Sequence, residues 1–457
     1  MSITSVSTHL PVHSAPIPVG SARPNQIRNA LIESIHALDQ VRSFFCVNPN
    51  TDFTRNCTLS FSKVVQTILG FGSSTVFGEL SEQLGNAPNI LTNIPTKSAF
   101  IISRQKILPD AFSFLFHKFM ARFSHFKTFK GYRVFASDSS LLPIPDNLHD
   151  YNTMVRGKPG TDPYHQMGIE ALYDLLNDTY VDFIVNDFND HSERASFLSL
   201  VRRIKNPGSV IITADRFYGS LNNIAHLSRA GVHFVLRCKD IDSNGFASKY
   251  DLPDSTFDLS FHKTITCSRK DMTDPSRDYQ FIHRKNFDFF RHDVDSVDID
   301  FRLVRVDLGN GHFELLVTDL PREAFSPDDL SELYRRRWKI ETSFRRLKHL
   351  MGTLFFHSYK HDSVLQEVYA KFILYNFTAM LSACVCVSDS PKRRLKRFVN
   401  FSVAIALSRS FLLGKCDPAA LIMRLRQDLC YVRPDRSAPR NHRLVTQPAE
   451  AFNSRAV

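Results

Sequence analysis

One short segment carries four residues whose side chains and spacing suit chemistry on a phosphate backbone. The stretch 333–348 contains no Gly or Pro, and it includes Tyr334, Arg337, Glu341 and Lys348. At about 100° per residue of a helix, the four positions fall within an arc of roughly 60°. A carboxylate can hold a divalent cation, and Arg and Lys can hold phosphates, so the row suits a metal-dependent reaction on a nucleic acid. The alternative is a solvated basic helix face with ordinary pairs, such as Arg337 with Glu341.

A helix from about Pro327 to Met351 is predicted to position these side chains. Ser326–Asp329 provides a start signal, with Pro at a first-turn position and acids in the first turn, and Gly352 provides a stop. An apolar stripe at helical spacing should bury the helix against a core, with Glu341 at the edge of that core. The stripe consists of Leu333, Ile340, Phe344, Leu347 and Met351.

The spacing of the four residues, in the context Arg-Trp-x-Ile-Glu-x-x-Phe-x-x-Leu-Lys, resembles the Y-R-E-K signature of DDE transposases of insertion-sequence family four. The resemblance implies that Glu341 is one of three catalytic acids. It also implies that Tyr334, Arg337 and Lys348 position phosphates around the scissile or flipped nucleotide. Two further acids are then required from earlier in the chain.

Two acids that follow apolar strands are the candidates. The β-rich run 132–138 ends in Asp138, and the short apolar run 209–215 ends in Asp215. Sites of α/β proteins gather at the carboxyl ends of strands, although Asp is also a common turn initiator. The segments FASDSSLLPIP and IITADRFYGSLNNIAHL resemble the first-Asp and second-Asp motifs of the same family, and HQMGIEALYDLLNDTYVDFIV resembles its second and third strands. The resemblance runs in consistent order over about residues 50–450.

One residue departs from the family pattern. The family usually has a small residue, mostly Gly, two positions after the second Asp, and this chain has Phe217. A Phe there is expected to crowd the backbone beside the site. Arg216 and Tyr218 still fit the motif, and Arg216 is a further candidate for phosphate binding. The departure keeps open a DNA-binding protein with a decayed transposase site, and a nuclease that never performs strand transfer is a second alternative.

Asp138, Asp215 and Glu341 are predicted to bind two Mg²⁺ ions, with Mn²⁺ as a substitute. Two ions about 3.5–4 Å apart can activate an attacking oxygen and stabilise a leaving one. Hard oxygen ligands without a Cys/His cluster favour these ions over zinc. The resemblance implies hydrolysis of DNA at the element ends, strand transfer by the freed 3′-OH and a hairpin intermediate. The partners that it implies are the terminal inverted repeats, double-stranded target DNA and a second protomer, in a homodimer on paired ends.

The order of predicted elements indicates an α/β fold. Three strands followed by helix, strand, helix and strand form the order expected of a ribonuclease-H-like catalytic core. A β-rich insertion precedes the helix of Glu341, and helical regions flank the core. The predicted organisation is a disordered segment 1–22, a helical DNA-binding domain 23–128, the catalytic domain 129–358 with its insertion at about 238–312, a helical C-terminal region 359–432 and a basic tail 433–457.

Three features stay open between DNA binding and ordinary structure. Residues 96–106 offer Lys, Ser, Arg and Gln on exposed faces, which fits a helix-turn-helix-like contact or a plain helical bundle. Phe287, Phe289 and Phe290 in the insertion are candidates for stacking on bases, with core packing as the commoner role. The basic cluster 392–397 fits either phosphate binding or a solvated face.

Composition narrows the class of protein. The chain has 457 residues and a net charge of +11, which suits an acidic polymer as partner but also fits any basic protein. Its eight cysteines include no Cys-x-x-Cys pair, which indicates reduced thiols rather than disulfides or a zinc site. The N-terminus lacks the pattern of a signal peptide, and the apolar stretch 372–387 is broken by polar residues, as in a buried helix. We expect a cytoplasmic, nucleoid-associated bacterial protein without membrane contact.

Overall fold

The structure is a computed structural model. It describes residues 16–85, 94–147, 150–156, 162–290, 295–309, 311–352, 355–387 and 395–431. The predicted basic tail, most of the predicted disordered segment and residues 392–394 of the basic cluster lie outside these ranges.

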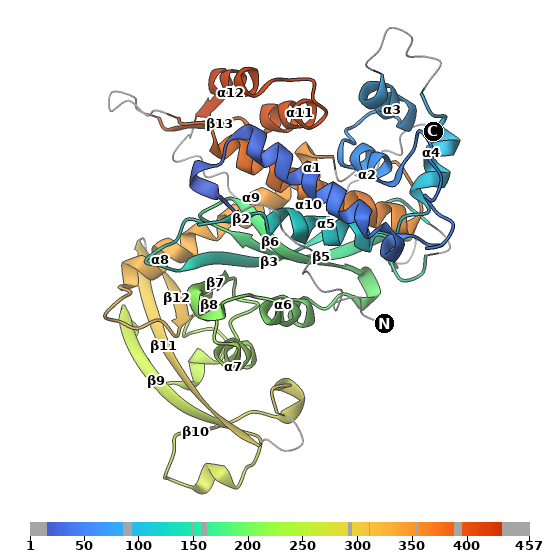
Figure 1. Cartoon of the computed structure of the whole chain (residues 1–457). Helices are drawn as coiled ribbons and strands as arrows, with labels where there is room; N and C mark the ends of the chain where they lie inside the picture. Colours follow the sequence, from blue (N-terminus) through green and yellow to red (C-terminus); the bar gives the residue numbers. More distant parts are fainter. Residues whose placement is uncertain are drawn as a thin grey trace.

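A ten-stranded mixed sheet runs through the protein (Figure 1). Its strand order is β10-β9-β11-β12-β8-β7-β3-β5-β4, and β6 also pairs with β5. The strands are β3 (Arg133–Ile144), β4 (Met154–Val155), β5 (Tyr164–Asp174), β6 (Thr179–Asp187), β7 (Val210–Ala214), β8 (His233–Arg237), β9 (Phe257–Thr266), β10 (Tyr279–Phe281), β11 (Ser296–Gly309) and β12 (His312–Thr318).

The centre of the sheet has the predicted succession of elements. β5 is antiparallel to both β3 and β6, whereas β7 runs parallel to β3 and β8 parallel to β7. Helix α6 (Glu193–Arg202) connects β6 to β7, and α7 (Leu221–Ala230) connects β7 to β8. Ser192 and Ser220 cap the two helices by accepting backbone N–H groups through their side chains. The predicted mixed α/β fold is therefore confirmed.

Helices cover both faces of this sheet. Helices α6 and α7 lie on one face, and the N-terminal and C-terminal helices lie together on the other (Figure 1). Helix α10 packs against α1, α2, α5 and α11, so the two ends of the chain share one hydrophobic core. A second core fills the space between the sheet and α6 and α7. The helices of the N-terminal and C-terminal parts are α1 (Pro24–Gln40), α2 (Phe61–Leu69), α3 (Val76–Leu84), α4 (Lys97–Arg104), α5 (Asp110–Met120), α10 (His361–Ala383), α11 (Phe401–Leu412) and α12 (Pro418–Gln427).

Two local predictions are wrong in detail. Strand β3 does not end at Asp138 but continues to Ile144, because β5 pairs with it along residues 135–144. The helix predicted over 327–351 is divided into α8 (Pro327–Arg336), α9 (Trp338–Arg345) and a π-helical turn at 346–350. The break follows from a tight hydrogen bond from the Arg337 N–H to the Tyr334 carbonyl. Gly352 ends the segment with a φ of +70°, as expected of a helix stop.

The insertion is β-rich, as predicted, and it extends the main sheet. β11 pairs with β9 and β12 in antiparallel fashion, and β12 joins β8 of the central strands. Phe287, Phe289 and Phe290 are buried in the second core, which rules out the stacking role considered for them.

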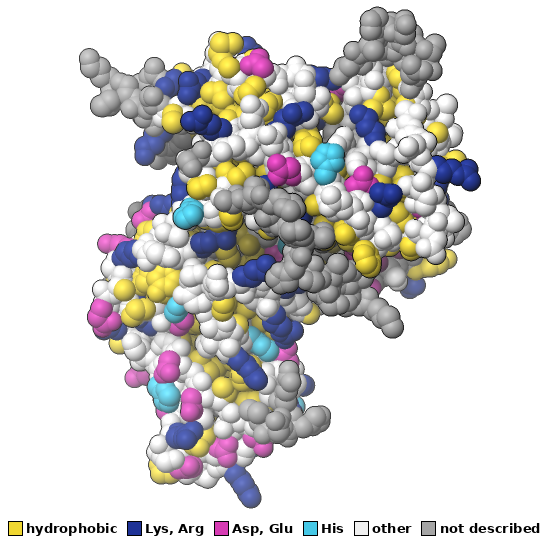
Figure 2. Space-filling view, viewed as in Figure 1, with side chains coloured by type: hydrophobic (Ala, Val, Ile, Leu, Met, Phe, Trp, Pro, Cys, Tyr) yellow, Lys and Arg dark blue, Asp and Glu magenta, His cyan; other side chains and the backbone are white. Residues whose placement is uncertain are grey.

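The cysteines, the apolar helices and the basic side chains were also considered in the sequence. All eight cysteines are free thiols. Among the described helices, none has the length and apolar character needed to cross a membrane. Lys and Arg side chains are spread over both the helical part and the insertion on the face seen in Figure 2.

Candidate active site

The first two predicted acids lie on neighbouring parallel strands. The pairing of β3 with β7 ends where Ser137 lies opposite Ala214. Asp138 is the next residue of β3 and Asp215 is the first residue after β7, so they lie side by side where β7 stops. Beyond this point β3 pairs with β5 and no longer with β7.

The third acid comes from α9, which packs against β3. The guanidinium of Arg337 connects it to the strand: Nη2 lies 2.8 Å from Oε1 of Glu341, and Nη1 lies 4.0 Å from Oδ2 of Asp138. The Glu341 side chain is 34% exposed, whereas that of Asp138 is 19% exposed. The structure thus brings all three predicted acids together.

Negative charge accumulates at Asp138. Burial raises the pKa of its carboxyl to about 7, and the charges of Glu341 and Asp215 add to that rise. The charge of Arg337 and a hydrogen bond from the Ser139 N–H act in the opposite direction. A carboxylate destabilised in this way favours a cation from outside the protein.

Arg337 is held in place but incompletely satisfied. Its side chain is 4% exposed and lies over the rings of Tyr334 and Trp338, at 5.5 and 5.1 Å. Its Nε and Nη1 atoms are buried without a hydrogen-bond acceptor among the described residues. Such donors are costly unless a ligand or water supplies an acceptor.

The other predicted phosphate-binding residues differ in their surroundings. Lys348 donates from Nζ to the Leu141 carbonyl of β3 at 2.6 Å, and burial lowers the pKa of its ammonium. Tyr334 is buried, which raises the pKa of its phenol. Arg216 is exposed on the turn that follows Asp215. The structure therefore brings Arg337 and Lys348 to the acids, with Tyr334 as a support under Arg337.

The donor chemistry fits a divalent cation, but the arrangement is not a closed ligand set. Three carboxylates with only oxygen donors converge, which suits Mg²⁺ or Mn²⁺. Within the described ranges, no three His, Cys, Asp or Glu side chains are grouped closely enough to hold a metal ion. The guanidinium of Arg337 contacts both Glu341, at 2.8 Å, and Asp138, at 4.0 Å.

Phe217 does not crowd the site, contrary to expectation. Its side chain is 51% exposed rather than packed among the acids. Its backbone N–H donates to Oδ1 of Asp215 at 2.8 Å, so the turn supports the acid.

A second acidic cluster, which was not predicted from the sequence, lies on the opposite face of β3. Glu170 is fully buried and accepts hydrogen bonds from the Ser137 hydroxyl at 2.8 Å and from the Tyr218 hydroxyl at 3.0 Å. Ser139 donates to Glu193. The sequence did contain a signal for this cluster. Ser137 and Ser139 flank Asp138, and neighbours in a strand point to the opposite face, where their hydroxyls need hydrogen-bond partners.

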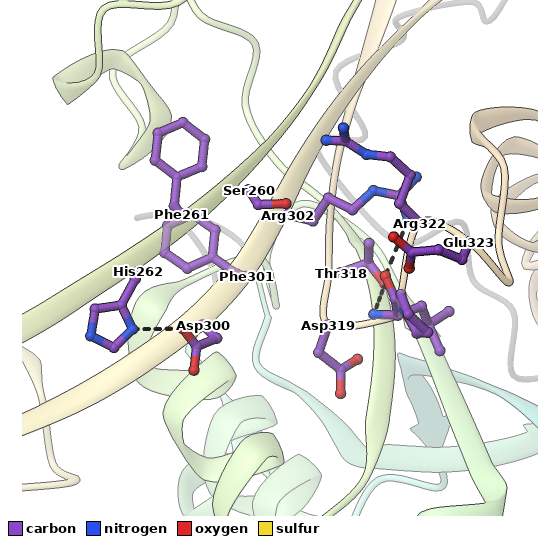
Figure 3. A pocket seen from close by; sticks show the side chains of 12 residues that line it. Ser260, Phe261, His262, Asp300, Phe301, Arg302, Thr318, Asp319, Arg322 and Glu323 are labelled. Carbon is purple, nitrogen blue, oxygen red and sulfur yellow. Dashed lines mark hydrogen bonds and ion pairs between the residues drawn. The ribbon is translucent and has the colours of Figure 1, made fainter.

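The cavity shown in Figure 3 lies elsewhere. It has a volume of about 530 Å³ and is formed by β9, β11 and the loop after β12. His262 and Asp300 are hydrogen-bonded in its wall at 2.6 Å. None of Asp138, Asp215 and Glu341 lines it. The candidate site is therefore defined by the convergence of charged groups on the sheet rather than by this cavity.

Comparison with known proteins bears on the family. Residues 129–377 match the family described as Transposase DDE domain. A comparison with curated proteins found no match. Among solved structures, the chain is similar to a cryo-EM structure of the piggyBac transposase synaptic complex with hairpin DNA. That similarity has 8% sequence identity and a TM-score of 0.47, and it covers 88% of this chain and 82% of the other.

The family match covers more than half of the chain. It begins just before β3 and ends within α10, so it includes all three converging acids together with Arg337 and Lys348. The protein therefore belongs to the transposase DDE domain family.

Proposed function

We propose that this protein is the transposase of a bacterial insertion sequence of family four. It would bind the terminal inverted repeats, cut the DNA ends by phosphodiester hydrolysis and join the freed 3′-OH to target DNA, with a hairpin intermediate. The observation that carries the proposal is the convergence of Asp138, Asp215 and Glu341 around Arg337. We also propose that β3, β5, β6, β7 and β8, with α6 and α7, form a ribonuclease-H-like core, since their order and directions agree with that fold.

Asp138, Asp215 and Glu341 would hold two Mg²⁺ or Mn²⁺ ions. When bound, these ions would polarise the phosphodiester and activate the attacking oxygen. The protein's own contribution is to gather the carboxylates against their mutual repulsion. Because the pKa of Asp138 is raised to about 7, this carboxyl group can lose its proton close to neutral pH.

Arg337 and Lys348 would position the DNA backbone. The unsatisfied Nε and Nη1 of Arg337 suit a non-bridging phosphate oxygen as acceptor, and charge-assisted bonds of this kind are strong. A phosphate there would also compete with Glu341 for the guanidinium and release the carboxylate. Lys348 keeps the π-helical turn attached to β3 through Leu141, and Arg216 would meet phosphates from the other side.

Double-stranded DNA is the proposed partner, as terminal repeats and as target. The net charge of +11 supports an acidic polymer, and basic side chains occur on both the helices and the insertion (Figure 2). We also propose a homodimer on paired ends, which rests on the resemblance to family four alone.

The direct test is cleavage of a labelled duplex that carries the inverted repeat flanking the coding sequence, with Mg²⁺ and with EDTA. We expect metal-dependent cutting that falls at least about a thousandfold in Asp138→Ala, Asp215→Ala and Glu341→Ala, as when a catalytic group is removed. Glu332→Ala is the matched control, because this acid lies on α8 and pairs with Arg336 outside the site.

Each proposed step has its own readout in this assay. Near-normal cutting by all three variants would contradict the site, and tight binding without cutting by the wild type would favour the decayed, DNA-binding alternative. Hairpin-sized strands on a denaturing gel would support the hairpin route. Joining of a pre-cleaved end to a supercoiled plasmid would exclude a nuclease without strand transfer.

A further inference from the structure

The turn between β7 and α7 presents an exposed aromatic ring beside the candidate site. Phe217 is 51% exposed and stands two residues after Asp215. Single exposed apolar side chains are common and need no explanation by themselves. This one differs because it belongs to the turn that carries a site acid, and its own N–H donates to that acid's carboxylate.

The backbone of this turn is tightly held. The N–H of Phe217 donates to the Asp215 carboxylate at 2.8 Å, and the N–H of Tyr218 donates to the Asp215 carbonyl at 3.1 Å. Asn223 donates from its side chain to the Tyr218 carbonyl at 2.9 Å. A Cβ at Gly219 would collide with the carbonyl oxygen of Arg237, so the turn packs directly on β8. The backbone that carries the ring is therefore fixed relative to the carboxylate.

The ring also has a firm support. The Phe217 and Tyr218 rings meet edge to face, with centroids 5.4 Å apart and planes at 85°. Tyr218 is buried, packs against Phe197 and is hydrogen-bonded to Glu170. A ring held from below and open to solvent on its other side is already organised for contact with a flat ligand, so little conformational entropy is lost on binding.

We propose that Phe217 is a stacking platform for a nucleobase next to the scissile phosphate. The inference rests on the proposed function, because that function brings a DNA phosphate to Asp138 and Asp215. A base is joined to its phosphate through a single sugar, so a phosphate held at these carboxylates brings a base close to the turn. Stacking on an aromatic ring accepts every base, because each base has a π face. Phe217 thus adds affinity at the cleavage position without adding sequence preference.

The test replaces the ring and not its bulk. Phe217→Leu keeps an apolar side chain without a π system, and Phe217→Tyr keeps the ring. Loss of stacking that is equal in substrate and transition state raises KM with little change in kcat, and one stacked base corresponds to about a 5- to 150-fold change. We expect that rise in KM for duplex cleavage in Phe217→Leu and near-normal values in Phe217→Tyr. Tyr431→Ala, an aromatic side chain of 58% exposure on strand β14 (Leu429–Tyr431), is the control and should cleave normally.

A second readout does not depend on cutting. Duplexes with 2-aminopurine on either side of the cleavage position are bound in EDTA, and stacking is followed as loss of fluorescence. Wild type and Phe217→Tyr should quench the probe at one of these positions, and Phe217→Leu should leave it bright at saturating protein. A probe ten base pairs inside the duplex should respond equally to all variants.

The outcomes separate this inference from the proposed function. Wild-type protein that binds and quenches but never cuts would overturn the enzymatic proposal while supporting the platform. Normal KM and normal quenching in Phe217→Leu would overturn the platform while leaving the enzyme intact. Equal losses in Phe217→Leu and Phe217→Tyr would also overturn it, because the ring would then not be the cause.

Discussion

Two buried glutamates in different layers of the protein have opposite surroundings. Glu170, behind the candidate site, is 0% exposed, and Glu367, in α10 among the helices, is 1% exposed. Glu170 is bonded by the hydroxyls of Ser137 and Tyr218, which are neutral. Burial raises its pKa to about 8, and the charges of Asp138 and Glu193 add to the rise.

Glu367 is surrounded by cations instead. Arg104 lies 2.9 Å from one carboxylate oxygen, and His357 lies 3.0 Å from the other. Burial by itself would raise the pKa of Glu367, but the charge of Arg104, the bond from His357 and the charge of Lys371 hold it at about 2. The same cluster joins α4 to α10, because Arg104 also bonds to Gln366.

The contrast teaches which region is built for stability. In the helical layer the buried carboxylate of Glu367 is matched by Arg104 within the protein, so the cluster fastens the N-terminal helices to the C-terminal ones. At the sheet the negative charge exceeds the available cations, which costs stability and prepares the place for an ion from solution. Removing an acid should therefore lower the stability of the fold in the helical layer and raise it at the sheet.

The largest effect on stability is expected for Glu367→Ala. Loss of the carboxylate removes the buried ion-pair partner of Arg104, which typically costs about 3–5 kcal/mol. Because the folded-state pKa of Glu367 lies below its ordinary value of 4.5, its contribution is present above pH 4.5 and is lost as pH falls towards 2. Urea unfolding at pH 7 and at pH 3 should show a large difference from wild type at the first pH and a smaller one at the second. A loss below about 1 kcal/mol at pH 7 would contradict the structural role of this cluster.

Asp138→Asn should act in the opposite direction in metal-free buffer. A folded-state pKa near 7, above the ordinary 3.8, means that Asp138 favours the folded state below pH 3.8 and loses that contribution as pH rises through 7. The variant should thus be more stable than wild type at pH 8 by about 2 kcal/mol, which is less than the full shift implies because water reaches the carboxylate.

Added Mg²⁺ provides the complementary measurement for Asp138. An ion that binds the folded state raises the melting temperature, so wild type should gain stability and Asp138→Asn should gain much less. Equal melting temperatures for the two proteins in EDTA at pH 8 would mean that the carboxylates do not oppose folding. An equal response of both to Mg²⁺ would place the ion elsewhere.

The sequence located these acids because their signals are local. Asp138, Asp215 and Glu341 lie in short motifs, and the strands and helices around them follow from apolar periodicity and from caps such as Ser192 and Ser220. The same local signals predicted the order of elements along the central sheet. The roles of Asp138, Asp215 and Glu341 in metal binding stay predictions, as do the roles of the neighbouring basic residues in phosphate binding.

The errors arose where distant partners decide. Strand β3 continues past Asp138 because β5, about thirty residues later in the chain, pairs with it. The division of the helix at Arg337 depends on a tight turn that the periodicity does not record. The role of Glu170 was not predicted, because its environment depends on Tyr218, 48 residues away. The predicted boundary between residues 128 and 129 also stays a prediction, and the helices before it share a core with α10.

The smallest effect on stability is expected for Glu170→Gln. This variant tests the difference between the two buried glutamates most directly. The folded-state pKa of about 8 lies above the ordinary 4.5, so Glu170 favours the folded state at low pH and loses that contribution as pH rises through 8. Glutamine is nearly isosteric and can still pair with the hydroxyls of Ser137 and Tyr218. We expect equal stability near pH 4, where the glutamate is largely protonated in both states, and a gain for the variant that grows as pH rises above 4.5 and reaches about 1–2 kcal/mol at pH 9. The measurement is thermal unfolding from pH 4 to 9 beside Glu367→Gln, which should lose stability throughout that range. If both variants lost stability equally at pH 9, burial alone would decide the fate of a carboxylate here, and the proposed difference between the two layers would be wrong.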